Sequence, residues 1–210
     1  MGNPKKQRKR YSTPNHPWKK ERIDSEKRLI KSYGLKNMKE VWKMKSFARD
    51  LASKAKEINA EEGETAEIEK ENLLNKCIKL GLLPKDSSLD DVLGLNARDV
   101  LERRLQTVLV KKSLARTYSQ SRQMITHRHV LVDGKVISSP SYLVPKSKEK
   151  SITFVETSPY SDEEHPEREL VRKEIKEEME GKKDKEDTPK KESKKGSKKK
   201  SKKKKVKKDE

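Results

Sequence analysis

Residues 101–145 read LERRLQTVLVKKSLARTYSQSRQMITHRHVLVDGKVISSPSYLVP, and a change of apolar spacing inside this stretch decides the fold. Leu101, Leu105 and Leu109 recur every four residues, which places them on one face of a helix. Asn96 is the expected N-cap, because its short polar side chain can accept hydrogen bonds from free backbone N–H groups. The stretch therefore begins with an amphipathic helix.

A second short helix is predicted to begin near Ser119 and to carry Met124 and Ile125 on its apolar side. Ser119 is positioned to cap this helix, whose first N–H groups would then be suited to a phosphate. Arg122, one turn further on, would lie on the same face.

The apolar spacing changes from helical to alternating at residues 129–132 and 135–137. Asp133-Gly134 between these β-branched runs predicts a hairpin with a type I′ turn, which needs positive φ at both positions. Two further strands are expected, at 142–144 and 151–155.

The chain before this stretch is predicted to be helical. Val41, Ala48 and Leu51 belong to a continuous apolar face that continues to Ile58 and indicates a packed helix. Further helices are expected from after Pro17 to Tyr33, ended by Gly34, and from Thr65 to Leu80, ended by Gly81, and Ser88 is expected to cap a short turn at 89–93.

The predicted fold class is α+β, with an N-terminal helical subdomain, a small domain of two helices and a short β-sheet, and disordered basic termini. The boundaries are 1–18 for a basic extended arm, 19–100 for the helical subdomain, 101–165 for the small domain and 166–210 for a charged, lysine-rich tail. Residues 182–210 contain 16 lysines against 6 Asp or Glu. Such a segment cannot bury enough apolar surface to offset its ordering entropy.

The composition indicates a polyanionic partner. The chain has 210 residues, a formal net charge of +19, 42% charged residues and only 29% hydrophobic residues. A nucleic acid is the natural partner, because no apolar run approaches the roughly 20 residues that cross a bilayer. The N-terminus has no apolar region typical of a secretory signal, and Lys6 stands where a myristoylation motif needs Ser or Thr. We expect no membrane partner and no small-molecule substrate.

Candidate chemistry outside RNA binding is weak. Cys77 is the one cysteine, so no intrachain disulfide can form, and a buried thiol in a reducing cytoplasm is the natural interpretation. His127 and His129 lack the further ligands that a closed metal site needs. Asp90-Asp91 fits a helix start better than a catalytic pair, and Ser119 has no neighbouring base. We therefore predict no enzyme activity, no metal and no cofactor.

Several motifs resemble those of one known family. LERRLQT, LAR-x-x-x-Q-S-R-Q-x-I-x-H and HVLVDGKVI resemble the RNA-binding domain named after small-subunit ribosomal protein S-four. MGNPKK, YSTPNHPWKKERI, YGLKN-x-KEVW and LDDVLGL resemble the archaeal form of that ribosomal protein family. The resemblance covers roughly residues 1–165. It implies that 101–165 is an S-four RNA-binding domain.

The resemblance also implies a partner and a place. Members of the family bind the five-prime domain of 16S-type ribosomal RNA, act early in assembly of the small (30S) subunit, and lie near the messenger RNA entrance beside protein S-five. There they support translational accuracy. The family's RNA-facing surface corresponds here to Arg103, Arg104, Arg116, Ser119, Arg122, Gln123, His127 and Lys135.

Further RNA contacts are expected from charge alone. They are Lys111, Lys112 and Arg128 in the S-four-like domain and Lys5, Lys6, Arg8, Lys9 and Arg10 in the arm. Trp18 either stacks on RNA or packs as a hydrophobic staple on the first helix.

Two departures from the family matter. Many relatives have Gly where this chain has Arg128, so a left-handed backbone is not expected there and the extra cation is free to contact a phosphate. Some bacterial relatives carry a cysteine-rich zinc knuckle, which this chain cannot form.

Three rival hypotheses differ from a resident ribosomal protein. An RNA-modifying enzyme that carries an S-four domain would need a catalytic domain of roughly 150 residues, for which there is no room. A ribosome-assembly factor with the same domain would leave the mature subunit. A histone-like DNA binder is favoured only by the lysine tail. We interpret that tail as a loose, non-specific RNA tether, with a nuclear-localisation-like address as the alternative.

Overall fold

The computed structural model describes residues 9–61, 63–162, 165–168 and 170. The predicted RNA contacts Lys5, Lys6 and Arg8 and the lysine-rich stretch 182–210 lie outside the described residues.

Three long helices form the N-terminal part, as predicted from the apolar spacing of the second and from the proline and glycine signals that bound the other two. They are α1 (Lys20–Tyr33), α2 (Met38–Ala60) and α3 (Glu64–Leu80). Gly34 and Gly81 follow α1 and α3 with φ of 57° and 70°, the left-handed conformation that ends a helix and that glycine adopts without a steric penalty.

Two short helices follow, each begun by a reciprocal cap. Ser88 and Asp91 form a capping box at α4 (Leu89–Leu93), and Asn96 and Asp99 form one at α5 (Ala97–Glu102). The predicted roles of Ser88 and Asn96 are therefore confirmed.

The helix expected to continue from Asn96 through Leu109 is instead two helices. The chain is extended at Arg104, between α5 and α6 (Leu105–Lys111). At this break the backbone forms hydrogen bonds with a distant segment: the Leu105 N–H donates to the Tyr142 carbonyl at 2.7 Å, and the Val144 N–H donates to the Arg103 carbonyl at 3.0 Å. The strand predicted at 142–144 is likewise wrong, because this segment forms only an isolated bridge with Arg104.

The next helix, α7 (Tyr118–Thr126), begins one residue earlier than predicted. Its cap is Thr117, whose side chain accepts a hydrogen bond from the Gln120 N–H at 3.2 Å. Ser119 lies inside the first turn and is exposed, so its predicted capping role is wrong.

The strands form a small antiparallel sheet in the order β2-β1-β3. They are β1 (Val130–Val132), β2 (Lys135–Val136) and β3 (Ile152–Phe154). Asp133 and Gly134 have φ of 55° and 72°, which confirms the predicted type I′ hairpin. Two 3₁₀ turns, η1 (Lys146–Lys148) and η2 (Pro159–Ser161), flank β3.

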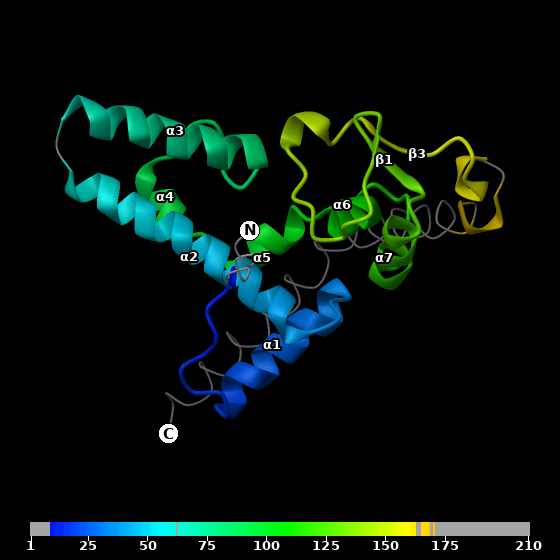
Figure 1. The fold of residues 1–210 in the computed structure, drawn as a ribbon, viewed down its shortest axis with the longest axis horizontal. Helices are drawn as coiled ribbons and strands as arrows, with labels where there is room; N and C mark the ends of the chain where they lie inside the picture. Colours follow the sequence, from blue (N-terminus) through cyan, green and yellow to red (C-terminus); the bar gives the residue numbers. More distant parts are fainter. Residues whose placement is uncertain (1–8, 62, 163–164, 169, 171–210) are drawn as a thin grey trace, which may run out of the picture.

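The two halves of the fold have separate cores, and the predicted α+β class is confirmed. One core joins α6, α7 and the sheet, with Leu109, Ile125 and Val130 fully buried. The helical part has its own clusters, one around Cys77 and one around Val41 and Leu101. In Figure 1 the α2–α3 hairpin and α4 lie on one side and α6, α7 and the strands on the other, with α5 between them.

Candidate nucleic-acid interface

Arg103 and Arg104, at the break between α5 and α6, are engaged within the protein. The Arg103 guanidinium donates to the Leu80 carbonyl at 2.8 Å, to the Val144 carbonyl at 3.0 Å and to the Glu149 carboxylate at 3.1 Å. Arg104 is 1% exposed and donates to the Glu40 carboxylate at 2.7 Å. Arg104 is buried and the Arg103 side chain is 15% exposed, so both guanidinium groups are engaged mainly within the protein, and we leave them out of the interface proposed below.

Arg122 reaches the same carboxylate from α7. Its two terminal nitrogens donate to the two Glu40 oxygens at 3.2 and 3.0 Å, in the bidentate geometry that suits arginine. Glu40, near the start of α2, therefore joins the helical part to both α7 and the α5–α6 break. The Arg122 side chain is 27% exposed, so its main engagement is this ion pair.

Burial of the Glu40 carboxyl raises its pKa, but the hydrogen bonds and charges of Arg122 and Arg104 outweigh burial and hold the pKa below its ordinary value. The carboxylate is thus ionised when the protein is folded near neutral pH. Nothing in the sequence near Glu40 indicates this role, since its partners lie 64 and 82 residues away.

One exposed face of α7 brings several predicted residues together. Ser119, Gln123 and His127 recur every four residues and are all exposed. Arg116 precedes this stripe and Arg128 follows it, and both are exposed as well. We call these five residues the α7 face. It presents hydrogen-bonding side chains along the helix and one cation just beyond each end of it.

Arg128 adopts the left-handed conformation that the sequence did not lead us to expect, with φ of 63°. The Arg128 N–H donates to the Ile125 carbonyl and the His129 N–H to the Met124 carbonyl, both at 3.0 Å. This pair of bonds is a Schellman motif, which requires a left-handed residue at this position after the helix. The sharp turn from α7 into β1 therefore imposes the conformation on an arginine.

The remaining predicted cations of the small domain are at its surface. Lys135 is exposed in the hairpin, and Lys112 is half-buried at the end of α6. Lys111 is exposed and forms an ion pair with Glu102 at 2.8 Å. An exposed pair of this kind contributes little to stability.

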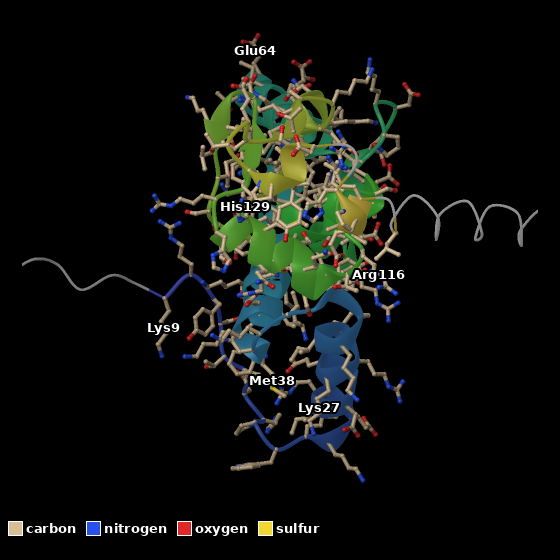
Figure 2. The ribbon with its side chains drawn as sticks, turned by 90° about the vertical axis from the view of Figure 1, so that its right-hand side faces the viewer. Lys9, Lys27, Met38, Glu64, Arg116 and His129 are labelled. Carbon is tan, nitrogen blue, oxygen red and sulfur yellow. The ribbon has the colours of Figure 1, made fainter. Side chains whose placement is uncertain are left out.

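The described part of the arm is fastened to α2. The Ser12 N–H donates to the Ser46 hydroxyl at 2.9 Å, and the Tyr11 and Trp42 rings lie 6.1 Å apart. Lys9 and Arg10 remain exposed just before these contacts. Figure 2 shows Lys9 and Arg116 extending outward on opposite sides of the molecule. The cations of the arm and of the α7 face can therefore reach different parts of one large partner.

Trp18 is 89% exposed, which excludes the hydrophobic staple in this structure. A nearly bare indole on a basic arm is suited to stacking on a nucleobase.

The aromatic cluster behind the α7 face was missed by sequence reasoning. His129 contacts the Ser158 hydroxyl through Nδ1 at 3.0 Å, and its ring packs edge-on against Tyr160. The Arg168 guanidinium lies 5.6 Å from the centre of the Phe154 ring. These contacts hold residues 158–162 and 165–168 against the sheet. Turn and charge patterns gave no signal for them.

The described residues contain no group of three or more side chains suited to hold a metal. Asp91 serves the capping box of α4, and Cys77 is fully buried, as predicted. Burial raises the pKa of the Cys77 thiol, which keeps it protonated and unreactive. Among the described helices, none is both long and apolar enough to cross a membrane.

Comparison with known proteins supports an RNA-binding assignment for the segment that carries the α7 face. The family model described as "S4 domain" matches residues 103–149. This match contains α6, α7, β1 and β2, together with the break at Arg103 and Arg104.

Relatives that match about 80% of the chain share one name. The chain is 49% identical over 171 residues to small ribosomal subunit protein uS4 of Nanoarchaeum equitans, covering 80% of this chain and 95% of that protein. It is 47% identical to the uS4 protein of Picrophilus torridus, over 79% of this chain and 92% of that one. It is 46% identical to the uS4 protein of Methanococcus aeolicus, over 80% and 96% respectively. These likenesses confirm the resemblance seen in the motifs, and the chain belongs to the small ribosomal subunit protein uS4 family.

Proposed function

We propose that this protein is a structural constituent of the small (30S) ribosomal subunit that binds ribosomal RNA and is not an enzyme. The observation that carries the proposal is the α7 face, which lies within the segment matched by the S4 domain and presents Arg116 and Arg128 to solvent. Cations of this kind neutralise phosphates and release counterions, which provides affinity without any chemical step.

We further propose that the RNA is the five-prime domain of 16S-type ribosomal RNA, and that binding nucleates assembly of the subunit. The separate positions of Lys9 and Arg116 support this, because a protein with cations on two sides can fix two RNA helices relative to each other. A location near the messenger RNA entrance, beside protein S-five, and a role in accuracy follow from the family resemblance.

The proposed interface consists of exposed side chains and the half-buried Lys112. Its members are Lys9, Arg10, Trp18, Lys111, Lys112, Arg116, Ser119, Gln123, His127, Arg128 and Lys135. If six of the cations each neutralise one phosphate, the logarithm of the association constant for RNA should fall linearly with the logarithm of the salt concentration, with a slope of about −5. Affinity would then drop by about 10³-fold between 50 and 200 mM salt.

The test is filter binding of the full chain to a transcript of the five-prime domain across a salt series. Arg116→Gln and Lys135→Gln should each weaken binding and reduce the slope by about 0.9. Lys70→Gln is the matched control, since Lys70 is an exposed lysine on α3, and Figure 1 shows α3 and α7 on opposite sides of the molecule. Equal affinity and equal slopes for all three variants would contradict the proposed interface.

Residence in the subunit needs a separate measurement. A resident protein co-sediments with mature small subunits in stoichiometric amount after a high-salt wash, within the cytoplasm. An assembly factor with the same domain would instead be confined to immature particles, and that result would replace the proposal.

A further inference from the structure

A groove lies where the helical part meets the S-four-like domain, between α1, α5, α6 and α7. Its volume is about 480 Å³, within the usual range for small-ligand pockets. Two tyrosines, Tyr33 from the end of α1 and Tyr118 from the start of α7, line it with ring centroids 6.1 Å apart and planes at 54°. We call it the tyrosine groove.

The backbone carrying these tyrosines is held in place by one buried amide. Gln106 is 1% exposed, and its side-chain nitrogen donates to the carbonyls of Gly34 at 3.0 Å and Tyr118 at 2.9 Å, with a longer contact of 3.4 Å to that of Tyr33. A Cβ on Gly34 would lie 2.6 Å from the Tyr118 Cβ, so only glycine permits this approach. The two rings are therefore prepositioned.

The rim of the tyrosine groove is cationic. Arg28, Arg98 and Lys111 line it and are exposed, whereas the one carboxylate in the lining, Glu102, is already paired with Lys111. Burial first, and then the charge of Glu102 and a hydrogen bond to its carboxylate, raise the pKa of Tyr33, so the phenol stays neutral. An anionic, aromatic ligand could stack on the two tyrosine rings and pair its negative charge with the cations at the rim.

We propose that the tyrosine groove is a binding subsite for a single unstacked nucleotide of the ribosomal RNA, with the base against Tyr33 and Tyr118 and the flanking phosphates on Arg28 and Arg98. This inference rests on the proposed function and specifies one contact within it. Base–aromatic stacking tolerates any base, because every base has a π-face.

The location of the groove favours RNA over a peptide ligand. Lys111 and Tyr118 are shared between the groove and the α6–α7 segment that carries the proposed interface, so an RNA strand on the α7 face is within reach of the groove. The exposed groups at its rim also match phosphates better than an apolar or basic peptide.

The first test compares Tyr118→Leu with Tyr118→Phe in the full chain, by filter binding to a transcript of complete archaeal small-subunit ribosomal RNA. Both variants retain the Cβ that packs against Gly34, but only phenylalanine retains a ring. Tyr118→Leu should bind about 5- to 150-fold more weakly, with an unchanged salt slope, whereas Tyr118→Phe should bind like the parent. Arg98→Gln should instead reduce the salt slope by about 0.9.

The outcomes separate this inference from the proposed function. If the parent chain binds the transcript and Tyr118→Leu binds equally well, the nucleotide subsite is refuted and the proposed function stands. If the parent chain does not bind the transcript at a salt concentration of 50 mM, the proposed function itself fails.

A second test needs no variant and is therefore insensitive to misfolding. The parent chain is irradiated in complex with a transcript containing 4-thiouridine, digested with trypsin, and searched for nucleotide adducts. Adducts are expected on the tryptic peptides 32–36 (SYGLK) and 117–122 (TYSQSR), which contain Tyr33 and Tyr118. Adducts on the arm peptides with none on these two would overturn the subsite.

Discussion

Replacing Arg128 by glycine should stabilise the protein, although it deletes a charged side chain. Arg128 has φ of 63°, and a left-handed conformation costs an L-residue about 1–2 kcal/mol. Glycine avoids this cost but loses about 0.5–1 kcal/mol more conformational entropy on folding. The difference predicts that Arg128→Gly raises the free energy of unfolding by up to about 1.5 kcal/mol.

The assay is urea unfolding of the full chain, with Arg128→Ala as the matched control. Both variants lose the same exposed guanidinium, so any effect of charge on stability is common to them. Alanine retains the left-handed penalty and should unfold at nearly the urea concentration of the parent or below it. If the glycine and alanine variants unfold at the same concentration, backbone strain at Arg128 is refuted.

Three further predictions concern the contacts that join the two halves of the fold. Glu40→Gln leaves Arg104 buried without its charge partner, and in urea titration it should lower the free energy of unfolding by about 3–5 kcal/mol. A loss under about 1 kcal/mol would count against the Glu40 carboxylate as the group that joins the two halves of the fold. The contacts with Arg122 and Arg104 hold the pKa of Glu40 in the folded protein below the ordinary 4.5. The stability that the ionised carboxylate contributes should therefore be complete above pH 4.5 and be lost as the pH falls through the folded pKa. In Glu40→Gln, the free energy of unfolding should consequently fall less steeply with acidification than in the parent. Gln106→Leu removes the donor to the Gly34 and Tyr118 carbonyls and should lower stability by about 2 kcal/mol, measured by thermal unfolding, where an unchanged melting temperature would contradict it.

Sequence reasoning succeeded where the signal is local. The capping boxes at Ser88 and Asn96 and the Asp133-Gly134 turn each depend on residues within three positions of one another. The apolar face of α2 likewise repeats along one helix, and so its partner surface could be anticipated. The motif series predicted the family for the same reason, because each motif is read as a continuous string.

The sequence could not predict which cations of the candidate site are engaged within the protein, because charge alone does not distinguish a surface cation from one held inside the fold. The partners of Arg103, Arg104 and Arg122 are brought to them only by tertiary structure, from residues far away in the sequence. The left-handed conformation of Arg128 was not predicted for a related reason. Its intrinsic preference disfavours positive φ, but the hydrogen bonds ending α7 override that preference.

The adjacent arginines at the α5–α6 break couple the unfolding of the two halves of the fold. Arg103 holds the end of α3 and residues 144–149, while Arg104 holds α2, so two consecutive residues tie both hydrophobic cores together. If either half unfolded alone, a buried guanidinium in the half that remained folded would lose its hydrogen-bond partners. A molecule built with divided cores is thereby expected to lose its structure in one all-or-none event.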